Sequence, residues 1–381
     1  MGRAAELRVL PLTSVRRLAA AALAPALLAL ASAAAVRATR PPAYDAVVDA
    51  SYRGPAGARV EGARRYRTIG AALADAPREP ALRFVVFIRA GRYREKLSVD
   101  RPHVTLLGED RDRTVITFDA AADTPAPGGG TWGMRGSWTL RVTAPGFRAQ
   151  DLTIENAFDY PANYAKREDD PTKLRNPQGV ALMLDGGSDR AAFENCRITG
   201  HQDTLFANAG RSWFHRSIII GNVDFIFGAG RAVFDDCDIV SRDRGARGRN
   251  GYVTAASTPM SQPYGFLVIR SRLKKETPSL APGSVALGRP WHPFADPYAA
   301  GSVVYVDSWM DDHVGAAAWD SMSSVSSSGT RYWYRPQNAR FFEYRSTGPG
   351  AVASPTRRVL SDGEAQAYTP ADVLDGWNPR A

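Results

Sequence analysis

Asp224 and Asp203 are the residues whose surroundings point most directly to chemistry. Asp224 lies within the apolar run VDFIF, and Asp203 lies in the polar stretch GHQDTLF. A lone buried carboxylate costs several kcal/mol unless a charge or hydrogen-bond donors compensate it. Two carboxylates held close together cannot both ionise easily, so the pKa of one rises while the pKa of the other stays low. Such a pair can supply an acid together with a base or a nucleophile.

Two glutamines, an arginine and a tryptophan could complete a site around these aspartates. Gln202 directly precedes Asp203, and Gln178 opens the segment QGVALML. Their side-chain amides could hold the oxyanion of an acyl transfer, although a glutamine can equally be stacked or solvent-facing. In the segment LGRPW, Arg289 could keep one aspartate ionised and aimed. Trp291 could pack against a sugar ring or simply be buried.

A repeated segment predicts the framework that positions these side chains. Each copy has an apolar residue, two mostly polar residues, a small or apolar residue, a variable residue and then Ile, Leu or Met. The copies are AQDLTI, FENCRI, FHRSII, FDDCDI, VIRSRL and YVDSWM, starting at residues 149, 193, 214, 234, 268 and 305. A period near 20–21 residues, lengthened where loops are inserted, is typical of a stacked β-solenoid. We therefore predict an all-β, single-domain parallel β-helix rather than a sandwich.

The same repeat predicts that the two aspartates are neighbours. Asp203 lies ten residues after Phe193, and Asp224 lies ten residues after Phe214. Equivalent positions on adjacent coils face the same way, with backbones about 5 Å apart. Asp203 is therefore the expected partner of Asp224.

The two cysteines are expected to be core thiols rather than a disulfide. Cys196 and Cys237 hold equivalent positions in copies two coils apart. At ~4.8 Å per coil they are about 9–10 Å apart, which exceeds the reach of a disulfide.

Other catalytic chemistries have less support in the sequence. No G-x-S-x-G elbow occurs, the five histidines show no metal-ligand spacing, and no Ser-His-Asp order stands out. His201 precedes Gln202, but strand alternation directs its side chain to the opposite side. The acidic run at 235–238 could bind calcium, yet alternate strand residues face opposite ways, which favours a solvated edge. We predict neither a metal nor a cofactor.

The N-terminus has the layout of a secretory signal peptide. Four arginines precede the apolar stretch 18–35, which Pro25 interrupts and which offers small residues at 31 and 33. A membrane anchor is the alternative, because the stretch is only marginally long enough to span a bilayer. Paired arginines at 16 and 17 leave twin-arginine export open beside the general route. The expected location is secreted or periplasmic.

Charge and composition narrow the expected partners. The 381 residues are 44% hydrophobic and 23% charged, as in a soluble globular protein. Removing residues 1–33 lowers the net charge from +9 to +6, which still favours polyanions at low salt. No basic-plus-aromatic nucleic-acid motif is present, so an acidic polysaccharide is the preferred partner. No stable membrane association and a monomer are expected.

The chain resembles the pectin methylesterase family. Five segments match the motifs of that family in its order, and the resemblance covers roughly residues 45–320. They are GRYREK (91–96), QGVAL (178–182), GHQDTL (200–205), DFIFG (224–228) and LGRPW (287–291). The resemblance implies a right-handed parallel β-helix without metal or cofactor. It also implies hydrolysis of the C6 methyl esters of pectin to methanol and pectate through an aspartyl acyl-enzyme.

The resemblance assigns a role to each matching catalytic residue. Asp224 would be the nucleophile on the ester carbonyl. Asp203 would protonate the departing methanol and then act as base on the hydrolytic water. Gln178 and Gln202 would hold the oxyanion, and Arg289 would position Asp224.

The resemblance also implies a substrate groove. Trp291 would pack against the sugar, and Phe206 and Phe227 match aromatic groove positions, with simple core packing as the alternative. Val223 is assigned to the same substrate-binding set. The charged insertion 167–177 could shape the groove or hinder access of the polymer.

The expected domain organisation has four parts. Residues 1–33 are the signal peptide, 34–44 a linker, 45–346 the β-helix catalytic domain, and 347–381 a tail that packs on the solenoid or is loosely ordered.

Alternatives to a pectin esterase stay open at this point. A same-family esterase or thioesterase could act on a non-pectin ester, because the carboxylate machinery recognises an acyl carbon. A β-helix glycosidase could use the same aspartate pair. A calcium-dependent pectate lyase would need a metal cluster, and a non-catalytic binding solenoid would be expected to lack one of the polar residues.

Overall fold

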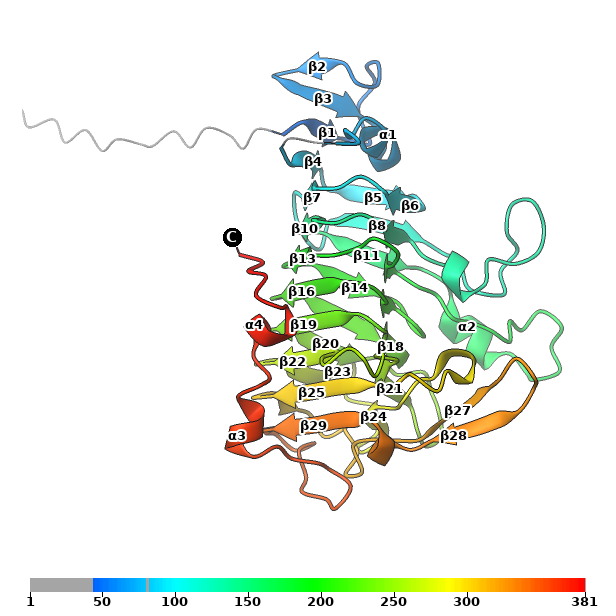
Figure 1. The fold of residues 1–381 in the computed structure, drawn as a ribbon. Helices are drawn as coiled ribbons and strands as arrows, with labels where there is room; N and C mark the ends of the chain where they lie inside the picture. Colours follow the sequence, from blue (N-terminus) through cyan, green and yellow to red (C-terminus); the bar gives the residue numbers. More distant parts are fainter. Residues whose placement is uncertain (1–43, 80–81, 381) are drawn as a thin grey trace, which may run out of the picture. The chain divides into compact units, whose positions relative to one another are not determined.

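The computed structural model describes residues 44–79 and 82–380, and over these the chain winds as a parallel β-helix (Figure 1). Strands of successive coils pair side by side in three long sheets of twelve, eight and seven strands within the described residues, here called sheets A, B and C. Side chains that point inward from all three sheets form one continuous core. The all-β, parallel β-helix prediction is confirmed.

The strands are assigned to the sheets as follows. Sheet A contains β1 (Ala46–Val48), β2 (Arg59–Val60), β3 (Ala63–Tyr66), β4 (Phe84–Ile88), β7 (Val104–Gly108), β10 (Arg148–Gln150), β13 (Ala191–Glu194), β16 (Arg211–His215), β19 (Arg231–Asp235), β22 (Phe266–Ile269), β25 (Ser302–Val306) and β29 (Arg340–Tyr344). Sheet B contains β5 (Gly91–Arg94), β8 (Thr114–Phe118), β11 (Thr153–Asn156), β14 (Arg197–Thr199), β17 (Ile218–Gly221), β20 (Asp238–Ser241), β23 (Arg272–Lys275) and β26 (Trp309–Met310). Sheet C contains β6 (Leu97–Val99), β9 (Leu140–Val142), β12 (Leu182–Leu184), β15 (Leu205–Ala207), β18 (Val223–Gly228), β21 (Gly251–Ala256) and β24 (Val285–Gly288).

Short helices and one hairpin lie outside the three sheets. The hairpin pairs β27 (Met322–Val325) with β28 (Arg331–Tyr334). The helices are α1 (Ile69–Ala74), α2 (Tyr160–Ala165), α3 (Asp362–Ala365) and α4 (Pro370–Val373), with 3-10 turns η1 (Met134–Gly136), η2 (Pro293–Ala295) and η3 (Pro336–Asn338). No helix among the described residues is both long enough and apolar enough to cross a membrane.

The repeated segment forms the corner where the chain passes from sheet A to sheet B. The third residue of every copy has a positive φ between 46° and 54°, and it is partly or fully exposed. The fourth residue points into the core in every copy. These inward residues are Leu152, Cys196, Ser217, Cys237, Ser271 and Ser308, each at most 1% exposed. The polar third position of the repeat therefore reflects a left-handed backbone at the corner, which occurs once in each copy. The small or apolar fourth position reflects burial in the core.

The register confirms the repeat. Phe193, Phe214 and Phe234 are direct partners on β13, β16 and β19, and their rings stack at 4.6 Å and 4.9 Å between centroids. Cys196 and Cys237 are buried free thiols, as predicted.

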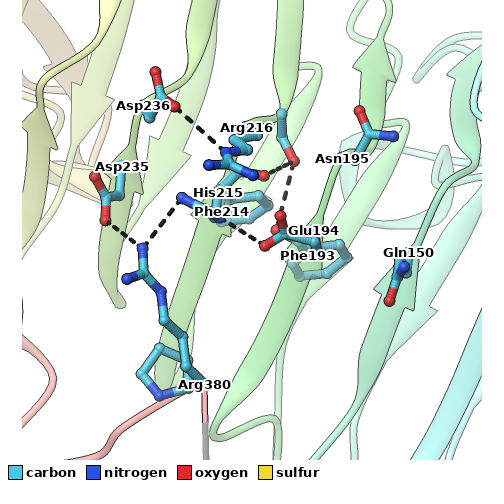
Figure 2. A network of polar contacts seen from close by, with 12 residues as sticks. Gln150, Phe193, Glu194, Asn195, Phe214, His215, Arg216, Asp235, Asp236 and Arg380 are labelled. Atoms are coloured by element: carbon cyan, nitrogen blue, oxygen red, sulfur yellow. Dashed lines mark hydrogen bonds and ion pairs between the residues drawn. The ribbon is translucent and has the colours of Figure 1, made fainter. Parts of the chain in front are cut away.

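The C-terminal segment packs across the outer face of sheet A. Leu360, Val373 and Leu374 are buried there in one cluster with Trp213 of β16. Figure 2 shows how the segment ends, with Arg380 reaching His215 on β16 and Asp235 on β19. Residues 1–33 and all of the predicted linker except Tyr44 lie outside the described residues, so the signal-peptide boundary stays a prediction.

The acidic run at 235–238 is ion-paired rather than arranged around a cation site. Asp235 accepts from Arg270, and Asp236 lies 3.6 Å from Arg216. Asp238 accepts from both Arg272 and Lys274. Among the described residues, no group of three His, Cys, Asp or Glu side chains is placed to hold a metal ion.

Candidate active site

Adjacent coils bring Asp203 and Asp224 together. β15 and β18 pair in parallel with Leu205 opposite Ile226, and the amide of Asp203 donates to the carbonyl of Val223 at 3.0 Å. Both aspartates have left-handed backbones, with φ of 63° and 50°. Asp tolerates this conformation better than most residues, and such backbones often occur at functional sites. The neighbouring positions inferred from the repeat are therefore those in the structure.

Arg289 forms a two-point ion pair with Asp224. Its Nε donates to Oδ1 at 2.8 Å and its Nη2 donates to Oδ2 at 2.5 Å, while the guanidinium lies 3.8 Å from the ring centre of Tyr252. Burial lowers the pKa of Arg289, but the Asp224 carboxylate outweighs burial and raises it overall. The guanidinium is therefore a permanent cation, and it holds the carboxylate of Asp224 in one orientation.

The backbone leading to Arg289 must approach the neighbouring coil closely. Arg289 follows Gly288 at the end of β24, and its amide donates to the carbonyl of Thr254 at 3.0 Å. A Cβ atom at Gly288 would lie 2.1 Å from the hydroxyl of Thr254. Glycine is thus required at this position for the backbone before Arg289 to lie against β21, the strand that pairs with the Asp224-bearing β18.

Asp203 differs electrostatically from Asp224. Burial and the nearby Asp224 charge raise the pKa of Asp203 well above its usual value, and Arg289 opposes that rise only partly. Asp203 is consequently the proton-bearing member of the pair, while Asp224 has the guanidinium partner. Acid-assisted acyl transfer needs one carboxyl group that holds a proton and one that is ionised, and the electrostatic difference between the two aspartates is compatible with that chemistry.

A cavity of about 240 Å³ opens over this pair. Its lining residues are Met134, Gln178, Gln202, Asp203, Asp224, Phe227, Ala255, Arg289, Trp291 and Met322. The amide oxygen of Gln178 is buried without a hydrogen-bond partner, and the amide of Gly179 donates to the carbonyl of Gln202 at 3.0 Å. The two glutamines therefore lie on successive coils at the same cavity, where their side chains can serve as donors.

Two of the predicted substrate-binding residues do not line the cavity. Phe206 is fully buried and stacks on Phe227 at 4.3 Å between ring centres. Val223 is 7% exposed and packed in β18. Trp291 lies steeply tilted to the rings of Phe206 and Phe227, with ring centres 6.2 Å and 5.6 Å away. Phe227 and Trp291 therefore line the cavity, and Phe206 packs against both of them without reaching it.

Comparison with known proteins decides the family. A model of the pectinesterase family matches residues 58–376. Pectinesterase A of Dickeya chrysanthemi is 40% identical over 327 residues, covering 83% of this chain and 88% of the relative. The structure of pectin methylesterase from Yersinia enterocolitica is 46% identical, with a TM-score of 0.79 over 82% of this chain and 99% of that one. The chain belongs to the pectinesterase family.

A third comparison concerns a ligand-bound family member. A pectin methylesterase solved in complex with a hexasaccharide is 41% identical, with a TM-score of 0.82 over 88% of this chain and 98% of that chain. Membership of this family makes the protein a carboxylic ester hydrolase, and the resemblance inferred from the motifs is confirmed.

The sequence did not identify a side-chain link between the two coils that carry the aspartates. His201 and Asn222 each lie two residues before an aspartate, and His201 Nδ1 is 3.1 Å from Asn222 Nδ2. Tyr160 of α2 stacks on the imidazole at 5.0 Å, and burial together with the charge of Arg242 lowers the pKa of His201 to about 3. The imidazole of His201 is therefore neutral and links the two coils through Asn222. The one sequence signal for this link is that His201 and Asn222 are 21 residues apart, the same separation as Asp203 and Asp224.

Met134 and Met322 were also missed as lining residues. Met134 comes from η1 and Met322 from the β27–β28 hairpin, both distant in sequence from the aspartates. Neither residue lies in a repeat copy, so no periodicity pointed to it.

The charged insertion 167–177 folds on itself beside α2. Glu168 pairs with Lys173 and Arg175, and the amide of Asn176 donates to Asp123. None of the residues 167–177 lines the cavity. The next residue along the chain, Gln178, does. Its effect on access of a polymer stays a prediction.

Proposed function

We propose that this protein hydrolyses the C6 methyl esters of polygalacturonate, releasing methanol and pectate through an aspartyl acyl-enzyme. The observation that carries the mechanism is the asymmetric pair: Asp224 is ion-paired with Arg289, and the adjacent Asp203 has a raised pKa. Family membership supports the substrate class.

In the first step, Asp224 attacks the ester carbonyl carbon. The carbonyl oxygen becomes an oxyanion, and the side-chain amides of Gln178 and Gln202 donate to it. Asp203 gives its proton to the methoxy oxygen as that bond breaks. Methanol leaves, and the galacturonyl group remains bound to Asp224 as a mixed anhydride.

In the second step, the roles of Asp203 reverse. Its carboxylate takes a proton from a water molecule that attacks the acyl carbon, and the same two amides hold the new oxyanion. The anhydride bond to Asp224 then breaks, which restores both carboxyl groups and leaves a free galacturonate. One ester and one water have become one acid and one methanol, without a metal or cofactor in any step.

Methanol release from highly methylated pectin tests this function. We compare the wild type with Asp224→Asn, which keeps the shape of the residue but removes the nucleophile. Asp235→Asn is the matched control, because Asp235 is also a buried aspartate hydrogen-bonded to an arginine, on sheet A. The wild type and the control should release methanol, and Asp224→Asn should show at least about a 10³-fold loss, in line with loss of a covalent nucleophile. If Asp224→Asn keeps its activity, pectin would remain the substrate, but Asp224 would not be the nucleophile.

We further propose that the mature protein is exported. The arginine-rich start and the apolar stretch 18–35 support a signal peptide cleaved after residue 33. N-terminal sequencing of the protein recovered outside the cytoplasm should begin at Ala34. Recovery of the intact N-terminus with membranes would instead support the anchor interpretation.

A further inference from the structure

His201 and Asn222 occupy the same place on the two coils that carry the aspartates. Each residue lies two positions before its aspartate, and the two are 21 residues apart. The amide of Asn222 donates to the carbonyl of His201 at 3.0 Å, and the amide of Asp203 donates to the carbonyl of Val223 at 3.0 Å. The two backbones are therefore hydrogen-bonded to each other where they lead into the left-handed aspartates.

The hydrogen bonds of the Asn222 side chain determine its orientation. Its Oδ1 accepts from the amide of Val223 at 2.8 Å, and its Nδ2 lies 3.1 Å from Nδ1 of His201. Because the N–H of Val223 can only donate, the oxygen of Asn222 faces Val223 and the NH₂ group faces the imidazole. His201 therefore accepts at Nδ1 and carries its proton on Nε2.

The imidazole of His201 is held in place as an acceptor. Tyr160 stacks on the ring with an angle of 8° between the planes, and Tyr160 is only 3% exposed. Burial and the charge of Arg242 lower the pKa of His201 to about 3, although the charge of Asp159 opposes that shift. The ring is therefore uncharged at neutral pH, and Nδ1 keeps a lone pair for Asn222.

The backbone that this pair fixes is irregular at Asp224. Between its pairs at Val223 and Ile226, β18 has one residue more than its partner β21. A β-bulge of this kind re-aims a side chain, and Asp224 lies inside it with a φ of 50°. The side chain of Asn222 binds the amide at the start of the bulge, where a slip of one residue would turn Asp224 away from Arg289.

We propose that His201 is a positioning residue for the nucleophile Asp224. The Nε2–H imidazole holds Asn222, Asn222 holds the amide of Val223, and the bulge fixed in this way aims Asp224 at the ester carbonyl. The proposal rests on the proposed function, because that function makes Asp224 the nucleophile. His201 does not line the catalytic cavity, so its loss should lower kcat and leave KM unchanged.

The tautomer of His201 provides a test on the wild type. His215 on sheet A is the matched reference, because it is buried and stacks on Trp213 at 4.8 Å between ring centres. Its Nδ1 faces the carboxylate of Glu194, and its Nε2 faces Arg380, which can only donate, so His215 should be the Nδ1–H tautomer (Figure 2). NMR of the ring nitrogens in protein labelled with ¹⁵N in its histidines should show opposite tautomers at neutral pH, with His201 as Nε2–H. A charged His201, or His201 as Nδ1–H, would overturn the proposal.

Rates of methanol release provide a second test. His201→Phe keeps a ring against Tyr160 but removes the acceptor, and the fully buried NH₂ group of Asn222 then loses its partner. We expect kcat to fall about tenfold, the effect of one buried hydrogen bond, with KM within about twofold of the wild-type value. His201→Gln, whose side-chain oxygen can accept from Asn222, should restore part of kcat. The control is His215→Phe, which loses its hydrogen bond to Glu194 and should keep the wild-type kcat.

The outcomes separate this inference from the proposed function. A wild type that releases no methanol from methylated pectin would overturn the proposed function, and the role of His201 with it. An active wild type would leave that function in place. The role of His201 alone would then be overturned if His201→Phe kept kcat, or if His201→Phe and His215→Phe lost kcat equally. Where His201→Phe does not fold, the tautomer in the wild type decides.

Discussion

The outer faces of sheets A and C both carry buried or half-buried charged side chains. On sheet A each charge has a complementary partner, whereas on sheet C two carboxyl groups share one cation. On sheet A, Glu194 accepts from His215 Nδ1 at 2.7 Å, and His215 Nε2 accepts from Arg380 at 3.1 Å (Figure 2). Asp235 closes the network with Arg270. Because a guanidinium only donates, His215 must be the Nδ1–H tautomer. Every donor in this network therefore faces an acceptor.

On sheet C, the two aspartates are placed side by side and share a single strong cation. Arg289 satisfies Asp224, whereas Asp203 is left with a raised pKa. The cavity beside the sheet A network measures about 540 Å³, against about 240 Å³ over the aspartates. Cavity size therefore does not locate the chemistry. A satisfied network stiffens a fold, whereas an incompletely satisfied one keeps reactivity available.

Exchanging the arginine partner of each buried aspartate for methionine should give the largest difference in activity between the two faces. Arg289→Met leaves the buried Asp224 carboxylate without the guanidinium that orients it through two hydrogen bonds, so Asp224 should attack poorly. We expect methanol release to fall by about 10²–10³-fold, as when a group that supports charge in the transition state is removed. Arg270→Met on sheet A should leave kcat unchanged. Equal losses of activity in the two variants would mean that the variants act through folding alone.

Removing the side-chain amide of Gln202 should show whether this residue stabilises the oxyanion or only packs against the substrate. Gln202→Ala should lower kcat about 10²-fold with little change in KM, because a donor aimed at the oxyanion acts mainly in the transition state. Initial rates of methanol release over a range of pectin concentrations measure both constants. A change confined to KM would assign Gln202 to substrate binding instead.

Stability should respond with opposite sign on the two faces. The pKa of Asp203 is higher in the folded state than in the unfolded state. Asp203 therefore lowers the free energy of unfolding by the full amount at any pH above the raised pKa, and it has no effect at a pH well below the unfolded pKa. Asp203→Asn should therefore raise Tm at neutral pH, by an amount on the order of a few °C, and the gain should vanish near pH 3. Glu194→Gln on sheet A should lower Tm at neutral pH. Thermal unfolding between pH 3 and 8 tests both signs.

The smallest effect is expected at the end of the C-terminal segment. Arg380→Met removes the donor to His215 and a 3.5 Å ion pair with Asp235, both at a largely exposed side chain. The free energy of unfolding, measured by denaturant titration, should fall by about 0.5–1 kcal/mol, and kcat should not change. A loss of activity in this variant would show that the sheet A network and the catalytic cavity are coupled.

Much of the framework follows from the sequence because the repeat is local. One left-handed corner and one inward residue per coil produce the spacing that relates Phe193 to Phe214, and the same spacing relates Asp203 to Asp224. In a solenoid each coil pairs in register with the next, so equal offsets along the chain become neighbours in space. The parallel β-helix, the free cysteines and the paired aspartates were predictable for this reason.

Contacts made by loops between the coils were decided by the tertiary structure. Arg289 reaches Asp224 across 65 residues, and Arg135 reaches Phe206 from a turn with no repeat. Phe206 illustrates the limit. The family resemblance assigned it to a substrate groove with core packing as the alternative, and in the structure it is fully buried, in contact with Phe227, Trp291 and the Arg135 guanidinium. Periodicity determines which face of a strand a side chain occupies. Whether that face is open to a ligand depends on loops of unequal length, whose packing no local pattern in the sequence encodes.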